Sequence, residues 1–216
     1  MSLGVVIVAG GAGTRLRPVT GDQPKALAPL GKGTLLSHLL ERIAPLAPER
    51  VVVLGGHQAQ AIAAVLPSEV ALLVEGSPLG TAGGLHQLPQ APETWLSLNI
   101  DHVSDLDLPA LLAAHDGRAT AVVHPVAHEV PHGVVQLVNG QLTGWTERPV
   151  QHIHVTVGAY VFSRAALSAH LHGQPMHMPA LIQALAPVHT FEHRGTWFDA
   201  GTPKRLRAAQ AWLDGL

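Results

Sequence analysis

Short apolar runs alternate with stretches of helical periodicity along the first 126 residues. Between residues 35 and 46 the apolar positions recur at steps of three and four, which is typical of one face of a helix. Residues 4–9, by contrast, form a continuous apolar run of the kind found in buried strands. The same reasoning predicts strands over residues 4–9, 50–55, 70–75, 95–99 and 119–126, and helices over 35–46, 57–66, 79–88 and 108–115. Such alternation indicates a mostly parallel sheet with helices on both faces.

The pattern changes after about residue 126. Residues 132–138 and 141–147 are separated by Asn139-Gly140, a dipeptide typical of a two-residue hairpin turn. The remaining chain predicts strands over 155–163, 188–193 and 197–199, and helices over 164–171, 178–186 and 202–213. We therefore expect an α/β fold in which a mixed, mostly parallel sheet is the middle layer of an α/β/α arrangement. One domain should cover 1–216, with a first half at about 1–126 and a mixed lobe at about 127–216.

Composition narrows the functional classes. The chain is 47% apolar and only 13% charged, and it has no cysteine, which excludes a disulfide scaffold, a thiolate nucleophile and a cysteine-ligated zinc site. A formal net charge of −2 lacks the positive excess of a nucleic-acid binder, so no nucleic-acid partner is expected. The first apolar run ends at Gly10 with no basic segment before it, and no run approaches the ~18 apolar residues of a membrane span. We expect a cytoplasmic protein without a membrane contact.

A glycine-rich loop follows the first predicted strand. Gly10, Gly11 and Gly13 let the backbone approach a ligand and expose several N–H groups to it. Arg15 lies in the same loop, and Lys25 follows after a short segment bounded by prolines. Backbone donors combined with fixed cations are what a polyphosphate requires. The alternative, a simple glycine-rich turn, does not account for these cations.

Two common phosphate-binding loops do not match this segment. The dinucleotide-binding fingerprint needs a third glycine where this chain has Leu16. A Walker loop needs Ser or Thr after Gly-Lys, and Gly33 follows Lys32 here. The loop therefore belongs to another class of phosphate site.

The 15 histidines are candidate metal ligands. The pairs His152/His154 and His170/His172 have spacings that could suit zinc or nickel, but neither joins a spaced set with carboxylates. We interpret the histidines mainly as structural or solvated residues, which make the net charge depend on pH between about pH 5 and 8.

The segment AGGAGTRLRPVTGDQPKALAPL at residues 9–30 is similar to the signature of the sugar-1-phosphate nucleotidylyltransferases. The resemblance continues in order along almost the whole chain, through PLGTAGGL at 78–85, NID at 99–101, HGVV at 132–135, TERP at 146–149, GAYVF at 158–162 and WFDAGTP at 197–203. Ile100 departs from the family pattern by replacing a glycine, His132 by replacing a tyrosine and Arg148 by replacing a lysine. Because Arg keeps the cation and adds a second donor, phosphate binding should survive.

The resemblance implies a Rossmann-like fold whose first half binds a nucleotide and whose second half binds a sugar. It also implies a reaction in which an NTP and a sugar 1-phosphate give an NDP-sugar and pyrophosphate. The attacking phosphate oxygen is already ionised, so alignment, charge neutralisation and Mg²⁺ suffice without a general base. The catalytic residues implied are Arg15, Lys25, Asp101 and Asp199, the two aspartates also holding the metal.

Taken singly, either aspartate could instead be a helix cap or turn residue, and Glu147-Arg148 could be an exposed turn.

The resemblance also implies two sets of binding residues. The expected nucleotide-binding residues are Ala9, Gly10, Gly11, Gly13, Thr14, Glu75, Gly80 and Thr81, and the expected sugar-phosphate residues are Gly133, Glu147, Arg148, Thr156 and Gly158.

Three functional readings stay open at this point. The segment around Gly80 favours GTP with mannose or heptose 1-phosphate. UTP with N-acetylmuramate 1-phosphate or a related hexose phosphate is the alternative substrate pair. A module that binds a nucleotide-sugar and regulates a partner without turnover is the alternative of another class, although none of the expected catalytic residues is missing. The sequence leaves homo-oligomerisation open.

Overall fold

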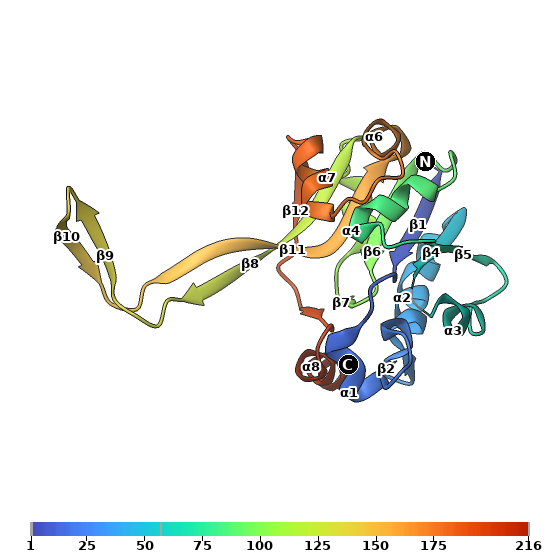
Figure 1. Cartoon of the computed structure of the whole chain (residues 1–216), viewed down its shortest axis with the longest axis horizontal. Coiled ribbons are helices and arrows are strands. Elements are labelled where there is room, and N and C mark those ends of the chain that lie inside the picture. Colours follow the sequence, from blue (N-terminus) through green and yellow to red (C-terminus); the bar gives the residue numbers. More distant parts are fainter. Residues whose placement is uncertain (1, 57, 216) are drawn as a thin grey trace.

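The computed structural model describes residues 2–56 and 58–215 (Figure 1). Its strands are β1 (Leu3–Val8), β2 (Pro29–Leu30), β3 (Gly33–Thr34), β4 (Arg50–Gly55), β5 (Val70–Val74), β6 (Thr94–Asn99), β7 (His102–Ser104), β8 (Ala119–Glu129), β9 (Val134–Val138), β10 (Gln141–Thr146), β11 (Val150–Ser163), β12 (His189–Glu192) and β13 (Trp197–Asp199). Its α-helices are α1 (Arg17–Thr20), α2 (Leu35–Ile43), α3 (Ala59–Ala63), α4 (Gly80–Gly83), α5 (Leu108–Ala113), α6 (Arg164–His170), α7 (Met178–Leu185) and α8 (Pro203–Asp214). Short 3₁₀ turns cover Thr14–Leu16, Lys25–Leu27, Ala44–Leu46 and Gly84–Gln87.

A seven-stranded sheet forms the centre, in the order β12-β8-β11-β6-β1-β4-β5. The pairs β1·β4, β1·β6, β4·β5 and β12·β8 are parallel, whereas β11 runs antiparallel to both β6 and β8. The sheet is thus mixed and mostly parallel, as the sequence predicts. Three two-stranded ladders, β2·β3, β7·β13 and β9·β10, lie outside it.

Apolar side chains cover both faces of this sheet. On β1, Val5 and Ile7 face a core shared with α2, α5 and α8, whereas Val6 faces a second core shared with α4, α6 and α7. Successive side chains of a strand point to opposite faces, so one apolar strand serves both cores. The three-layer α/β/α arrangement is confirmed.

The predicted elements agree closely with the observed ones. The helix predicted over 57–66 corresponds to α3, although its predicted first residue, His57, lies outside the described residues. The hairpin turn is confirmed, because Asn139 and Gly140 have φ angles of 49° and 80°, the left-handed conformation that such a turn requires. None of the helices among the described residues has the length and apolar character needed to cross a bilayer.

The second half contains a feature that the sequence pattern does not predict. The outer parts of β8 and β11 leave the sheet together as a two-stranded ribbon, with the β9·β10 hairpin at its end (Figure 1). We call residues 124–156 the arm. The ladder between β8 and β11 continues through it, from Thr156 opposite Val123 to Val150 opposite Glu129. The register shifts between Thr156 and Tyr160, at the root of the arm, where Gly158 has a φ of 76°.

Candidate functional site

Two cavities open at the carboxyl ends of the central parallel strands. β1 lies between β4 and β6, so the chain leaves β1 toward one side of the sheet and later returns to the other. Open α/β sheets bind ligands at such a switch point. The larger cavity, of about 570 Å³, includes the glycine loop and the segment after β5. The smaller cavity, of about 260 Å³, lies at the end of β6 beside the root of β11.

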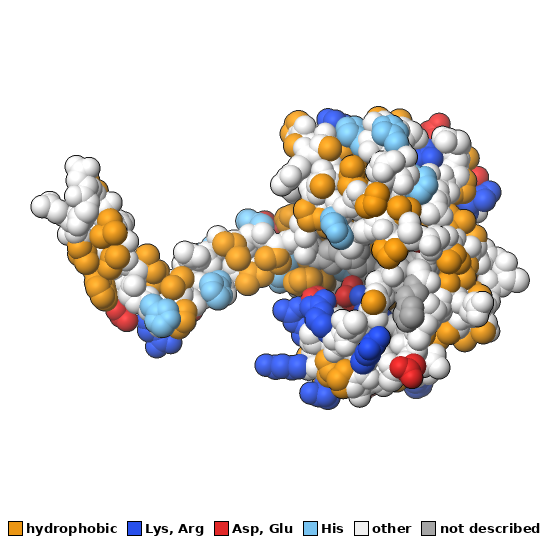
Figure 2. Space-filling model, in the orientation of Figure 1, with side chains coloured by type: hydrophobic (Ala, Val, Ile, Leu, Met, Phe, Trp, Pro, Cys, Tyr) orange, Lys and Arg blue, Asp and Glu red, His pale blue; other side chains and the backbone are white. Residues whose placement is uncertain are grey.

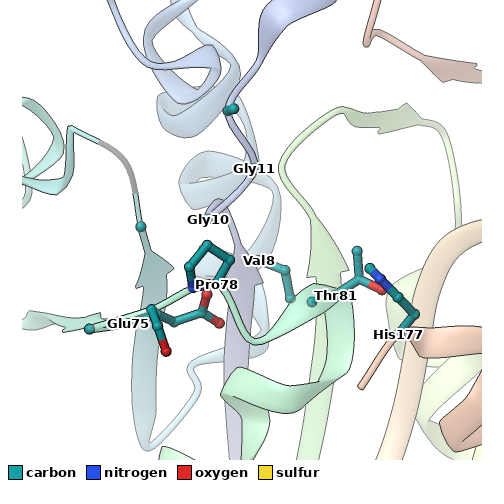
Figure 3. A pocket seen from close by; sticks show the side chains of 12 residues that line it. Val8, Gly10, Gly11, Glu75, Pro78, Thr81 and His177 are labelled. Carbon is teal, nitrogen blue, oxygen red and sulfur yellow. The ribbon is translucent and has the colours of Figure 1, made fainter. Parts of the chain in front are cut away.

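The larger cavity holds five of the predicted nucleotide-binding residues. Figure 3 shows Gly10 and Gly11 on one side, Glu75 beneath Pro78, and Thr81 beside His177. Gly80 also contributes to the lining. The other three predicted residues, Ala9, Gly13 and Thr14, belong to the same loop but do not line the cavity.

Close contacts explain why glycines occupy this cavity. Gly80 has a φ of 78°, and a Cβ atom there would lie 2.6 Å from the Met176 carbonyl oxygen. The Glu75 carboxylate fits between two other glycines: a Cβ on Gly10 would lie 3.4 Å from its Oε2 atom, and one on Gly84 would lie 2.2 Å from its Oε1 atom. Glu75 Oε2 also accepts a hydrogen bond from the Leu79 backbone N–H at 3.3 Å, which fixes the carboxylate at the cavity wall.

Arg15, Asp101 and Asp199 converge in the smaller cavity. The shared point is marked by Gly201, where a Cβ atom would lie 2.8 Å from Asp199 Oδ1, 3.0 Å from Asp101 Oδ2 and 3.2 Å from Arg15 Nη2. One methyl-sized volume therefore touches both carboxylates and a guanidinium. Thr156 and Gly158, two of the predicted sugar-phosphate residues, line the same cavity.

A short ladder brings the two aspartates together across 98 sequence positions. Asp199, at the end of β13, stands opposite His102, the first residue of β7, and His102 follows Asp101 directly. The Ala200 N–H also donates to the Asp101 carbonyl oxygen at 2.8 Å. Asp199 does not cap α8, because Thr202 is the N-cap residue and accepts from the Arg205 N–H. Its carboxylate instead accepts from the Gly201 N–H at 3.1 Å and pairs with Arg205 at 2.5 Å.

Lys25 joins this group through Asp101. Its Nζ atom lies 2.8 Å from Asp101 Oδ2, and both side chains are largely shielded, at 16% and 14% exposure. Burial raises the pKa of the Asp101 carboxyl, but the Lys25 ammonium and its hydrogen bond outweigh burial, so the net pKa is lowered and Asp101 is ionised at neutral pH. The glycine loop packs on Lys25: Gly13, with a φ of 61°, would place a Cβ atom 3.0 Å from the Lys25 Cβ. The loop and Asp101 therefore share one cation.

The two carboxylates fit a magnesium ion. Their oxygens face one small volume, and Mg²⁺ prefers hard oxygen ligands at about 2.1 Å, of which one or two carboxylates commonly suffice when phosphates and water complete the shell. No group of three or more His, Cys, Asp or Glu residues gathers as a metal cluster within residues 2–56 and 58–215. Asp101 and Asp199 could therefore supply two of the oxygen ligands of a metal that also binds phosphate and water.

Residues that the sequence did not select also line the smaller cavity. Burial lowers the pKa of His102 to about 4, so its ring is neutral at neutral pH. Nδ1 donates to the Val157 carbonyl oxygen at 2.8 Å, and Nε2 accepts from Ser104 Oγ at 2.7 Å, which ties β7 to the root of the arm. Asn99 packs against Gly158, where a Cβ would lie 2.6 Å from its Nδ2.

The sequence has few signals that mark these residues as part of a cavity. Asn99 belongs to the NID segment and Trp197 to the WFDAGTP segment, but His102 is one histidine among 15. His177 reaches the larger cavity from the residue before α7, far from any glycine motif.

Three of the predicted sugar-phosphate residues are not brought to the smaller cavity. Gly133, Glu147 and Arg148 lie on the arm, where Trp145 Nε1 donates to Glu147 Oε2 at 3.0 Å and Arg148 pairs with Glu129. Between Thr156 and Val150 alone, six residues of extended strand span about 20 Å. The reason is the length of β8 and β11, which continue well beyond the sheet and take the hairpin with them (Figure 1).

The chain is similar to known proteins over almost its whole length. The family model described as nucleotidyl transferase matches residues 4–214. The mannose-1-phosphate guanylyltransferase catalytic subunit beta of Dictyostelium discoideum is 29% identical over 221 residues, covering 92% of this chain and 61% of that protein. The mannose-1-phosphate guanyltransferase of Schizosaccharomyces pombe is 28% identical over 223 residues, with the same two coverages. The chain thus spans about three fifths of the length of these relatives.

Solved structures share the fold. A putative glucose-1-phosphate thymidylyltransferase from Bacillus anthracis superposes with a TM-score of 0.78 at 19% identity, covering 99% of this chain and 96% of that one. HddC from Yersinia pseudotuberculosis complexed with GMP-PN gives a TM-score of 0.75 at 21% identity, covering 97% of this chain and 99% of that one.

Proposed function

This chain belongs to the nucleotidyl transferase family, and from that membership and the geometry of its two cavities we propose that it joins an NTP to a sugar 1-phosphate. The products are an NDP-sugar and pyrophosphate. The observation that carries the proposal is the convergence of Arg15, Asp101 and Asp199 on one methyl-sized volume, with Lys25 bonded to Asp101 and packed on the glycine loop.

The chemistry needs no general base. An oxygen of the sugar phosphate, already ionised at neutral pH, forms a new bond to the α-phosphorus of the NTP. The bond from that phosphorus to the bridging oxygen breaks, and its electron pair leaves with pyrophosphate. Catalysis then consists of aligning two anions and neutralising the charge that develops on them.

Each group has a place in this reaction. The exposed N–H groups at Gly10, Gly11 and Gly13 bind the phosphates, and Arg15 neutralises the departing pyrophosphate. Lys25 stands between the α-phosphate and the sugar phosphate, because it reaches from the loop to Asp101. Asp101 and Asp199 would hold Mg²⁺, which would supply Lewis-acid stabilisation of the phosphate charge when bound.

Glu75 supports guanine as the base. Guanine presents two adjacent donors, N1–H and the N2 amino group, which match the two oxygens of a carboxylate. Uracil and thymine present a single N–H between two carbonyl oxygens, which a carboxylate repels. Glu75 lines the larger cavity and is held there by the Leu79 N–H. The guanylyltransferase names of the two curated relatives favour the same base, and mannose 1-phosphate as its partner.

Pyrophosphate release tests the proposal. The protein is incubated with Mg²⁺ and each of GTP, UTP and dTTP, combined with mannose, heptose, N-acetylmuramate or glucose 1-phosphate. GTP with mannose or heptose 1-phosphate should give the highest kcat/KM. A UTP preference would support the alternative substrate pair. Binding of the nucleotide-sugar without turnover across the panel would instead favour the regulatory module and refute the proposed enzyme.

A matched pair of variants tests the role of Glu75. Glu75→Gln keeps the size of the side chain but replaces one acceptor by a donor, so kcat/KM for GTP should fall about 10- to 100-fold relative to UTP. Glu69→Gln, an exposed residue just before β5, makes the same chemical change outside the cavity and should leave the ratio unchanged. An unchanged ratio in Glu75→Gln would remove guanine recognition from this residue.

A further inference from the structure

The arm exposes an apolar surface that nothing in one chain covers. Between residues 127 and 156 no residue is buried, and eight of the eleven large apolar side chains exposed in the described part of the chain lie there. Six of them are 45–65% exposed: Leu137, Val138, Leu142, Trp145, Val150 and Ile153. A two-stranded hairpin in water is marginally stable by itself and needs a surface to pack on. Figure 2 shows the arm reaching away from the body with apolar side chains along it.

The excess surface has the size of a protein interface. A compact chain of 22.7 kDa is expected to expose about 9,500 Å², whereas this chain exposes 11291 Å². The difference, about 1,800 Å², exceeds the roughly 800 Å² that each partner buries in an interface of standard size. Covering the arm by a second chain would bring the exposed surface per chain back to the ordinary range.

The chemistry of the hairpin favours a protein surface as the partner. Residues 133–146 contain no Lys, Arg, Asp, Glu or His, and they include Trp145. Interface centres are depleted of charged residues and enriched in aromatic ones, whereas nucleic acids and anionic lipids require cations.

The acidic and basic side chains of the arm lie only where the hairpin meets the ribbon, at Glu129, Glu147 and Arg148, and their net charge is −1. On the body, Lys and Arg side chains gather below the root of the arm (Figure 2). The glycine loop and α8 carry exposed cations, among them Arg15, Lys204 and Arg205.

The separation of the binding residues identifies the partner. If the proposed function holds, Glu147 and Arg148 bind the sugar phosphate beside Thr156, yet their own strand places them more than about 20 Å away from it. Folding the ribbon back on its own cavity would have to bend a β8·β11 ladder that is paired at every residue from Val150 to Thr156. A second copy of the chain satisfies both requirements, because one two-fold rotation places each arm on the other body.

We propose that the chain forms a two-fold dimer by exchanging arms, so that Glu147 and Arg148 of each copy complete the smaller cavity of the other. The inference rests on the proposed function for the role of these two residues. The apolar hairpin supplies the contact area, and the acidic junction of the arm meets the cationic rim of the opposite cavity. Each active site then contains residues of both chains.

Complementation between two inactive variants tests the exchange. Lys25→Ala damages the body, and the double variant Glu147→Ala with Arg148→Ala damages the arm, while circular dichroism checks that both are folded. After subunit exchange at equal concentrations, half of the dimers are mixed and each mixed dimer has one complete site, so about a quarter of the wild-type rate should return with GTP and mannose 1-phosphate. Each variant alone should stay inactive. If the mixture also stays inactive although wild type turns over, arm exchange is refuted.

A crosslinking experiment is independent of activity, so it separates the failure of this inference from that of the proposed function. The chain has no cysteine, so Glu147→Cys and Thr156→Cys each carry one unique thiol. Because each variant has a single thiol, a short bifunctional maleimide can only join two different chains. Mixing the two variants should give a covalent dimer of twice 22.7 kDa, well above the yield from either variant alone. Only monomers in the mixture would overturn the exchange, whatever the wild-type activity.

Discussion

Replacing Gly201 by alanine is the most direct test of the convergence at the smaller cavity. The new methyl would lie 2.8 Å from Asp199 Oδ1, 3.0 Å from Asp101 Oδ2 and 3.2 Å from Arg15 Nη2. Gly201 does not have a positive φ, so alanine fits its backbone without strain. The substitution therefore acts on the proposed catalytic groups and leaves the local chain conformation intact.

The size of the effect follows from these contacts. Carbon and oxygen atoms pack comfortably at about 3.5 Å, so the two carboxylates must move by roughly half an ångström each. Because misplacing reacting groups by about 1 Å can cost 100-fold in rate, we expect kcat to fall about 10- to 100-fold, or ~1.4–2.7 kcal/mol in activation free energy. The lower conformational entropy of unfolded alanine offsets the packing cost by about 0.4–1 kcal/mol. The free energy of unfolding should therefore change by less than about 1 kcal/mol, or ~2–4 °C in Tm.

Steady-state kinetics and thermal unfolding check both parts. The KM for GTP should change little, since Gly201 lies outside the larger cavity, whereas the Mg²⁺ concentration for half-maximal rate should rise. Gly215→Ala is the matched control, because its Cβ would meet its nearest atom at an ordinary 3.5 Å and its φ is −93°. Wild-type kcat in Gly201→Ala would refute the assignment of this volume to the reacting groups, and so would a loss of rate explained by unfolding.

Three further outcomes follow from the same geometry. Lys25→Ala and Asp101→Asn should each lower kcat at least about 100-fold while the protein stays folded by circular dichroism, and wild-type rates in both would contradict their assignment. Gly11→Ala should raise the KM for GTP about tenfold at unchanged Tm, because its Cβ meets no atom of the chain within 4 Å and enters the space of the ligand; a lower Tm with unchanged KM would contradict this. His102, with its pKa lowered to about 4 by burial, is neutral in the folded chain, so its contribution to stability is complete above an unfolded pKa of about 6.5 and decreases as pH falls toward 4. In metal-free urea unfolding, wild type should lose about 2 kcal/mol more than His102→Gln between pH 7.5 and pH 5, the exposed His172→Gln serving as control, and parallel pH profiles for wild type and His102→Gln would contradict the buried neutral ring.

Local patterns were sufficient to predict the sheet and its helices. Val5, Val6 and Ile7 form an apolar run because successive side chains enter two different cores, and such a run can be recognised as a buried strand from the sequence alone. Short or polar strands cannot be recognised in this way. β7 has only three residues, His102–Ser104, and it forms because β13 pairs with it from far along the chain. The outer half of β11 alternates His, Ile and Val without a buried face, so no pattern of burial marked it.

The residues of the candidate site can likewise be divided into those that the local sequence predicts and those that depend on the fold. The glycine loop is local in sequence, so Gly10, Gly11 and Lys25 could be predicted from spacing and residue type. The meeting of Asp101 with Asp199 depends on the β7·β13 ladder, and only the resemblance to a family indicated it before the fold was known. No sequence pattern marks His102, because its role is to connect that ladder to Val157 by one buried hydrogen bond.

A sequence motif gives the type of a functional residue but not the copy of the chain in which it acts. Glu147 fits the family pattern and Arg148 keeps the cation of the lysine it replaces, yet the number of residues in the β8·β11 ribbon, rather than the pattern, decides which cavity they reach. Each paired residue beyond Val123 and Thr156 moves the hairpin about 3.3 Å farther from the body, and no change of side chain can reverse that displacement. Within the described part of the chain, the hairpin also has the most exposed large apolar side chains. The same length of ribbon that removes Glu147 and Arg148 from their own cavity therefore supplies an apolar surface that can hold them in the cavity of another copy.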